Sequence, residues 1–110
     1  MSTQSVKFAV ARSCLMLPHP AGEEASISEA MHNIMLALDG FQVPDDFNDD
    51  AARQLSELRE FLNTKGLSDP LKEGLHTVRA RGMDEDQRAR FSHLVDELAW
   101  AFEEYERENR

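Results

Sequence analysis

The hydrophobic residues of this 110-residue chain recur at spacings of three and four, the period that places them on one face of an α-helix. Five segments show this pattern, and residues that begin or end helices bound most of them. The segments cover residues 4–17, 26–38, 46–64, 69–81 and 84–106. We therefore predict an all-α fold, a four- or five-helix antiparallel bundle, with residues 1–110 forming a single domain.

The first segment permits two interpretations. Val6, Val10, Cys14 and Leu17 recur at helical spacing, whereas Val6, Phe8 and Val10 alternate as they would in a half-buried strand. We predict a helix that buries the stripe of Val6, Val10 and Cys14. It must end before Pro18, because proline disfavours the helical conformation in the residue that precedes it.

Two later segments begin with the spacing of a capping box, in which the first side chain and the one three positions later each bond the other's backbone N–H. Ser26 with Glu29 predicts one helix start, and Asp84 with Gln87 predicts another. Both pairs stand directly before an apolar stripe, so we expect both boxes to form.

Glycine and proline predict the remaining boundaries. Gly40 and Gly66 each follow an apolar stripe and can take the left-handed conformation that closes a helix. Gly40 would close the second helix. Gly66 would close the third, which we therefore expect to reach residue 64. Asp69 stands before Pro70, and a capping aspartate before proline is typical of a helix start. This pair predicts that the fourth helix begins at residue 69.

Charge restricts the partners. The chain has 21 Asp and Glu against 12 Lys and Arg, a net charge of -9, which repels nucleic acid phosphates and anionic membranes and favours basic protein surfaces. The charge is -2 over residues 1–40, -4 over 41–64, +2 over 65–82 and -5 over 83–110. Cys14 is the only cysteine, and no apolar run reaches the roughly 20 residues of a membrane span, so we expect a cytoplasmic protein without disulfides.

Trp100 is the most informative residue. It lies nine positions after Phe91 and therefore on the side of the last helix opposite to the apolar stripe. Its neighbours one turn away are acidic, with a histidine one turn further back: Asp96, Glu97, Glu103, Glu104 and His93. An aromatic side chain within an acidic rim is typical of a contact for a basic partner protein. Two alternatives are that Trp100 packs beneath the N-terminal segment, or that it packs against a second copy in a homodimer.

A second candidate partner-binding surface lies on the second segment. Met31 and Met35, together with Ile34 and Leu36, make its apolar stripe wider than a one-sided surface helix needs. Methionine-rich faces adapt to different partners, so we predict that Met31 and Met35 contribute to binding.

The sequence offers little chemistry for catalysis. Glu29 with His32 and Glu73 with His76 have the spacing of ligand pairs in di-iron bundles, but each histidine lies about 140° from the start of its apolar stripe and points outward. Cys14 on an apolar stripe is typical of a buried small residue. We therefore predict no enzyme activity, no metal and no cofactor.

A nucleic-acid-binding function is an alternative. Segments 46–64 and 69–81 resemble a helix-turn-helix in outline, with Lys72, His76 and Arg79 on the outer face of the second helix. Glu73 shares that face, and four aspartates begin the preceding helix, so direct contact with nucleic acid is disfavoured.

In size, acidity and helical content, the chain resembles bacterial inhibitory proteins. These include nuclease immunity proteins and, more closely, the anti-activators that sequester quorum-sensing transcription regulators of the LuxR type. This resemblance implies a regulator that is kept from dimerising or from binding DNA. We therefore predict a non-enzymatic inhibitor or adaptor that sequesters another protein.

Overall fold

The computed structural model describes residues 3–16, 22–69, 72 and 74–108. Within these ranges the chain forms five helices and no strand, which confirms the predicted all-α class. The helices are α1 (Thr3–Cys14), α2 (Glu23–Leu38), α3 (Asp49–Phe61), α4 (Leu75–Arg81) and α5 (Glu85–Glu108). Pro18 and Pro70, which were predicted to bound helices, lie outside the described residues.

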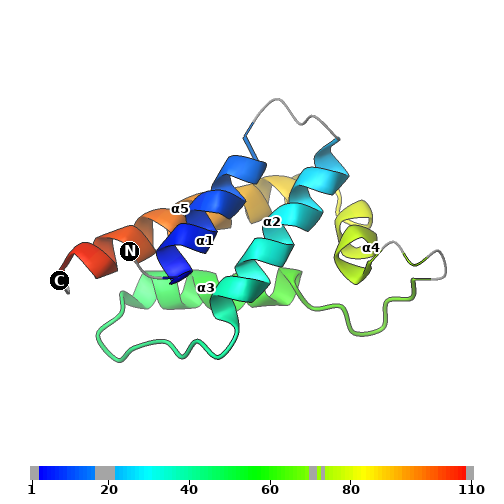
Figure 1. Cartoon of the computed structure of the whole chain (residues 1–110). Helices are drawn as coiled ribbons and strands as arrows, with labels where there is room; N and C mark the ends of the chain where they lie inside the picture. Colours follow the sequence, from blue (N-terminus) through cyan, green and yellow to red (C-terminus); the bar gives the residue numbers. More distant parts are fainter. Residues whose placement is uncertain (1–2, 17–21, 70–71, 73, 109–110) are drawn as a thin grey trace.

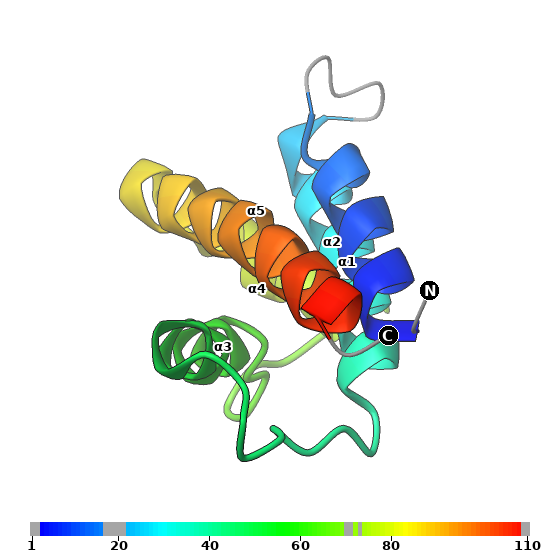
Figure 2. The same cartoon turned by 90° about the vertical axis from the view of Figure 1, so that its left-hand side faces the viewer.

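Four of the helices form two antiparallel pairs that cross one another. α1 and α2 lie side by side at the front of the view in Figure 1, and α3 and α5 form the second pair behind them (Figures 1 and 2). α1 also packs on α5, and the short α4 packs against α2. Together they make one globule with principal extents of 45 × 30 × 23 Å. The predicted antiparallel packing therefore holds within each pair, while the pairs are inclined to each other.

The core fills the space between the two pairs. Its largest fully buried side chains come from four helices: Phe8, Ile27, Met31, Ile34, Leu55, Leu58, Phe91, Leu94, Val95 and Leu98. Each of these contributes about 1.5–3 kcal/mol when it is removed from water. Leu55 and Leu58 belong to α3, and the last four belong to α5.

A cluster of aromatic rings surrounds Phe102 of α5. Its ring centroid lies 4.9 Å from that of Phe8, 5.5 Å from that of Phe41 and 5.3 Å from that of Phe47. Phe47 also meets the ring of Tyr105, at 5.3 Å. These contacts tie α1 and the connection between α2 and α3 to the C-terminal half of α5.

The buried face of α1 differs from the predicted stripe. Phe8 and Ala11 are fully buried, whereas Val6 and Val10 are each 40% exposed, and Cys14 is half-buried. A phenylalanine ring gains more on burial than a valine, and Phe8 finds an aromatic partner in the core. The choice of helix over strand is confirmed, but the choice of face is wrong.

The two predicted capping boxes have different outcomes. At α5 the box forms as predicted, because Gln87 N–H donates to Asp84 Oδ1 at 2.8 Å and Asp84 N–H donates to Gln87 Oε1 at 2.9 Å. At α2 it does not form, because the helix already begins at Glu23 and Ser26 is buried inside it. Because of this earlier start, Ser26 lies inside the helix and not at its N-cap.

The boundaries of the third and fourth predicted helices also change. α3 begins after Asn48, whose Oδ1 accepts from Ala51 N–H at 3.1 Å, and it ends at Phe61 rather than at residue 64. Gly66 has a positive φ of 80° but lies in a later turn. Asp69 does not begin a helix. Its Oδ2 accepts from Gly74 N–H at 2.6 Å, and α4 starts only at residue 75.

Polar contacts hold α4 in place. Arg79 Nε donates to the Phe61 carbonyl at 3.0 Å, and Thr77 shares a hydrogen bond of 3.0 Å with Ser28 of α2. Arg88 of α5 donates to the Ala80 carbonyl at 3.3 Å. Ala80 is the only fully buried residue of this seven-residue helix. The helix is therefore anchored more by hydrogen bonds than by apolar burial.

Candidate functional site

A groove of about 740 Å³ lies between α3 and α5. Its apolar lining consists of Phe47, Ala51, Trp100, Ala101 and Tyr105. The aromatic cluster around Phe102 fixes the start of α3 beside α5, because Phe47 contacts both Phe102 and Tyr105. The groove is thus a product of the fold and not of one helix.

Carboxylates predominate among the charged residues of the groove. Six line it: Asp46, Asp50, Glu57, Glu97, Glu104 and Glu108. The lining arginines are Arg53, paired with Asp50, and Arg90, which donates from Nε and Nη2 to the carboxylate of Glu57 at 2.5 and 2.8 Å. Six carboxylates against two arginines leave the lining with an excess of four negative charges at neutral pH.

Two polar contacts inside the groove shift the pKa values of Glu57, Arg90 and Tyr105. The hydrogen bond from Arg90, together with its charge, holds the pKa of Glu57 below its usual 4.5 and raises that of Arg90. Tyr105 donates its hydroxyl to Asp46 Oδ1 at 2.9 Å, and this bond raises the pKa of the phenol. The first contact favours the anionic form of Glu57, and the second favours the neutral phenol of Tyr105.

Trp100 stands at the edge of the groove and is 61% exposed. The interpretation that it packs beneath the N-terminal segment is therefore wrong. A smaller hollow, lined by Arg12, Asp96, Glu97 and Trp100, adjoins its other side. Trp100 and Glu97 thus form a ridge between two hollows, and the indole is open to a partner from both.

The carboxylates around Trp100 are partly neutralised. Arg12 of α1 pairs with Asp96 at 2.6 Å. Arg107 bridges Glu103 at 3.2 Å and Glu104 at 2.7 Å. The pairing with Arg107 follows from helical spacing, whereas only the packing of α1 on α5 brings Arg12 to this place.

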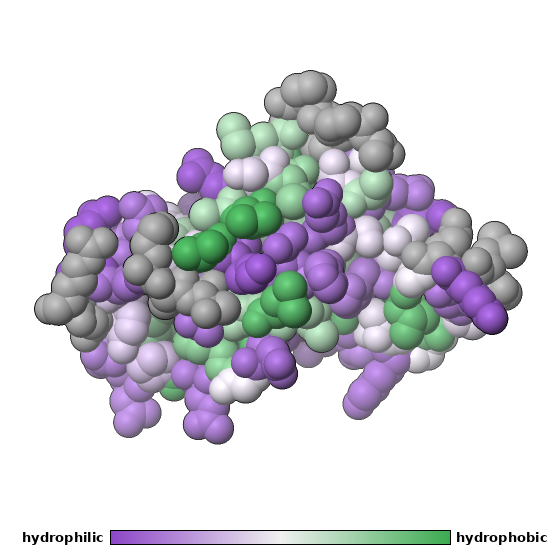
Figure 3. Space-filling view, viewed as in Figure 1, coloured by the Kyte–Doolittle hydropathy of each residue, from purple (hydrophilic) through white to green (hydrophobic). Residues whose placement is uncertain are grey.

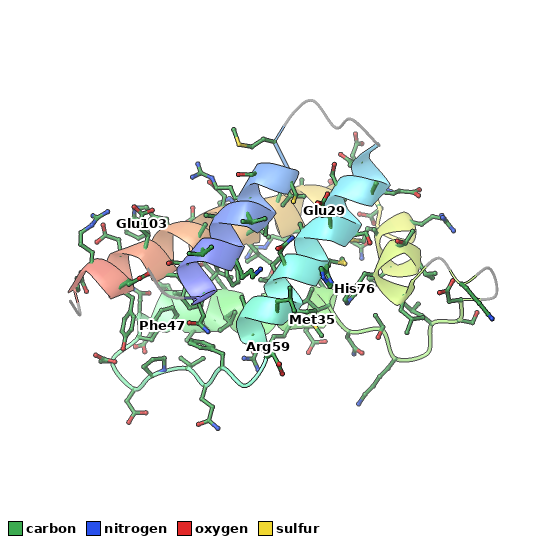
Figure 4. The ribbon with its side chains drawn as sticks, in the orientation of Figure 1. Glu29, Met35, Phe47, Arg59, His76 and Glu103 are labelled. Carbon is green, nitrogen blue, oxygen red and sulfur yellow. The ribbon has the colours of Figure 1, made fainter. Side chains whose placement is uncertain are left out.

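His93 and Glu103 lie around the groove rather than in it. His93 Nε2 is 3.8 Å from Glu97 Oε1, and its ring lines a third, shallow hollow beside Met16, two residues after the end of α1. In Figure 4, Glu103 points to the side of α5 away from Phe47, which marks the groove. Of the predicted acidic residues, only Glu97 and Glu104 line the groove.

Sequence reasoning missed the wall that α3 contributes. Gln54 and Glu57 of α3 line the groove, together with Asp46 and Asn48 just before α3, although all four are at least 28 residues before the start of α5. The acidic first turn of α3 was visible in the sequence, but its pairing with α5 depends on tertiary packing.

The second candidate surface, on α2, is partly buried and partly exposed. Met31 and Ile34 are fully buried in the core, so the prediction that Met31 contacts a partner is wrong. Met35 and Leu36 are 45% and 46% exposed. Figure 3 shows hydrophobic atoms over α1 and the lower end of α2, interrupted by hydrophilic ones. These exposed residues stay a predicted contact.

The described histidines and the cysteine are the sequence's candidates for metal ligands and a nucleophile. No group of three or more His, Cys, Asp or Glu there could hold a metal ion, and Glu73 lies outside that part of the chain. Burial lowers the pKa of His76, with the nearby charge of His32 adding to the effect. Burial also raises the pKa of Cys14, which favours the less nucleophilic thiol.

The residues predicted to share the basic outer face of the fourth helix do not form one exposed surface. Lys72 lies before α4, His76 is half-buried, and the Arg79 guanidinium is engaged with the Phe61 carbonyl. α4 packs chiefly against α2 and not as the second helix of a pair with α3. The arrangement offers phosphate groups few free cations.

In comparisons with known proteins, no family model, no curated protein and no solved structure matches this chain. Within the described ranges, no helix has both the length and the apolar character needed to cross a membrane.

Proposed function

We propose that this protein is a non-enzymatic inhibitor or adaptor that sequesters another protein through the groove between α3 and α5. One observation carries the proposal, namely that Trp100, with 61% of its surface exposed, stands at the edge of a groove with excess negative charge. Burying an exposed tryptophan supplies affinity, and the surrounding carboxylates guide a basic partner into place.

The finer form of the proposal is an anti-activator that acts in the cytoplasm on a transcription regulator. Surfaces that bind DNA are rich in lysine and arginine, because they neutralise phosphates. An acidic groove is complementary to such a surface, so its occupation would keep the regulator from DNA. A basic nuclease would present the same chemistry.

The proposal is tested by capturing partners from the native cell with tagged protein and identifying them by mass spectrometry. We expect Trp100→Ala to weaken capture of the main partner by at least about 2 kcal/mol, roughly thirtyfold in affinity. Met35→Ala tests the second candidate surface, where Met35 is 45% exposed. Val43→Ala is the matched control, because Val43 is 40% exposed and lies outside both candidate surfaces. Helical content measured by circular dichroism should be the same for all three variants.

Two results would contradict the proposal. Equal capture by Trp100→Ala and the unmodified chain would remove Trp100 from the interface. Loss of capture only in Met35→Ala would transfer binding to α2.

A further inference from the structure

The groove combines an aromatic edge with an acidic rim. Trp100, at 61%, is the most exposed of its apolar lining residues, since Phe47, Ala51 and Ala101 are at most 9% exposed and Tyr105 is partly buried. The small side chains of Ala51 and Ala101 line it where α3 and α5 face each other. A partner element can therefore approach the two helices closely there while covering the indole at the edge.

The rim fixes the charge of the occupant. Both lining arginines already bind carboxylates of the groove, so neither is free to attract an acidic ligand. Glu97 pairs with His93 at 3.8 Å, and the side chains of Glu97 and His93 are 44% and 54% exposed. Lysine and arginine of a partner would find acceptors here, whereas aspartate and glutamate would be repelled.

The walls favour a helical occupant over an extended one. Both walls are helices, and the described residues contain no strand whose free edge could pair with an extended peptide. A helix satisfies its own backbone hydrogen bonds and needs only side-chain contacts from the groove. A second copy in two-fold contact would set carboxylates against carboxylates, which disfavours self-association at this face.

We propose that the groove binds an amphipathic helix of the partner, with an apolar stripe that covers Trp100 and with lysine or arginine along both flanks. This inference rests on the proposed function and names the chemistry of its partner. The α5 residues that line the groove extend from Arg90 to Glu108, a rise of about 27 Å, which a partner helix of about 18 residues would span.

The chain carries its own reporter for this test. Trp100 is the only tryptophan, so with a peptide that lacks tryptophan the fluorescence at long excitation wavelength comes from this residue alone. The probe is an 18-residue peptide with leucines at helical spacing and lysine and arginine on both flanks. Its counterpart has the same leucines, with glutamate on the flanks.

We expect the basic peptide to shift Trp100 emission to shorter wavelength in a saturable way and to gain helicity on binding. Its affinity should fall about tenfold between roughly 0.1 and 1 M salt, because screening shortens from about 10 to 3 Å. The acidic peptide should cause no shift. Equal shifts with both peptides, or binding of the basic one without a gain in helicity, would overturn the proposal.

Matched variants test the role of the rim. Glu97→Gln with Glu104→Gln should weaken binding of the basic peptide about two- to thirtyfold, since an exposed ion pair contributes a few tenths to one kcal/mol. Glu29→Gln with Glu60→Gln removes the same charge from two exposed positions outside the groove and should leave binding unchanged. Equal effects of the two double variants would contradict a specific role for the rim.

The remaining outcomes separate the two proposals. If the basic peptide causes no shift but capture of a cellular partner still depends on Trp100, the protein-binding function stands and the helical basic occupant is refuted. If both fail, both are refuted. A shift of Trp100 emission on concentrating the protein alone would assign the groove to a second copy and overturn the inference.

Discussion

Replacing Phe102 with alanine should be among the most destabilising changes in this protein. The side chain is 3% exposed, and its ring meets three other rings within 5.5 Å. Truncation of a buried phenylalanine costs about 3–5 kcal/mol, and each aromatic pair adds about 0.5–1.5 kcal/mol beyond its area. With three pairs lost, we expect the upper end, about 4–5 kcal/mol, out of a total of roughly 5–15 kcal/mol for a domain.

Trp100, two positions earlier on the same helix, is the matched control. Because 61% of its surface stays exposed, folding removes only roughly 80 Å² of it from water, so Trp100→Ala should cost at most about 2 kcal/mol. Urea unfolding followed by far-ultraviolet circular dichroism gives both free energies of unfolding. If Phe102→Ala does not fold, Phe102→Leu should still cost about 1–3 kcal/mol. A cost for Phe102→Ala no larger than that for Trp100→Ala would refute the central place of the aromatic cluster.

Two further predictions concern ionisation and capping. Burial holds the pKa of His76 below 6.5 in the folded state, so the unfolded chain binds more protons and stability falls as the pH drops from 6.5 through that lower pKa. The thermal midpoint should therefore decrease more between about pH 7 and pH 5.5 in the unmodified chain than in His76→Gln, and equal decreases would contradict this. Asp84→Ala should cost about 0.5–2 kcal/mol in urea unfolding by removing the cap of α5. Glu29→Ala, which breaks no cap, should cost far less.

Sequence spacing predicted the helices better than their ends. Asp84 with Gln87 and Ser26 with Glu29 have the same spacing, but only the first pair caps a helix. The difference arises because α2 begins at Glu23, one turn before Ser26. Glu23 accepts there from Arg88 of α5 at 2.6 Å, a contact that spacing along the chain does not reveal.

The part of the site that lies on α5 was predictable from the sequence. The opposite placement of Trp100 and the buried stripe follows from the helical period, and the exposure of the indole agrees with it. The groove beside Trp100 was not predictable, because its second wall comes from α3. Burial of Met31 but not of Met35 depends likewise on how α1 and α4 cover α2.

The small apolar burial of α4 has a consequence for how the molecule fluctuates. A seven-residue helix with one fully buried side chain opens locally at a small fraction of the global unfolding free energy, so its amide protons should exchange with solvent early. α4 lies at the end of the molecule away from the C-terminal half of α5 (Figure 1). Such openings leave the packing of α3 against α5 unchanged. The groove is therefore preorganised, and a ligand that enters it meets a surface whose ordering entropy was already lost on folding.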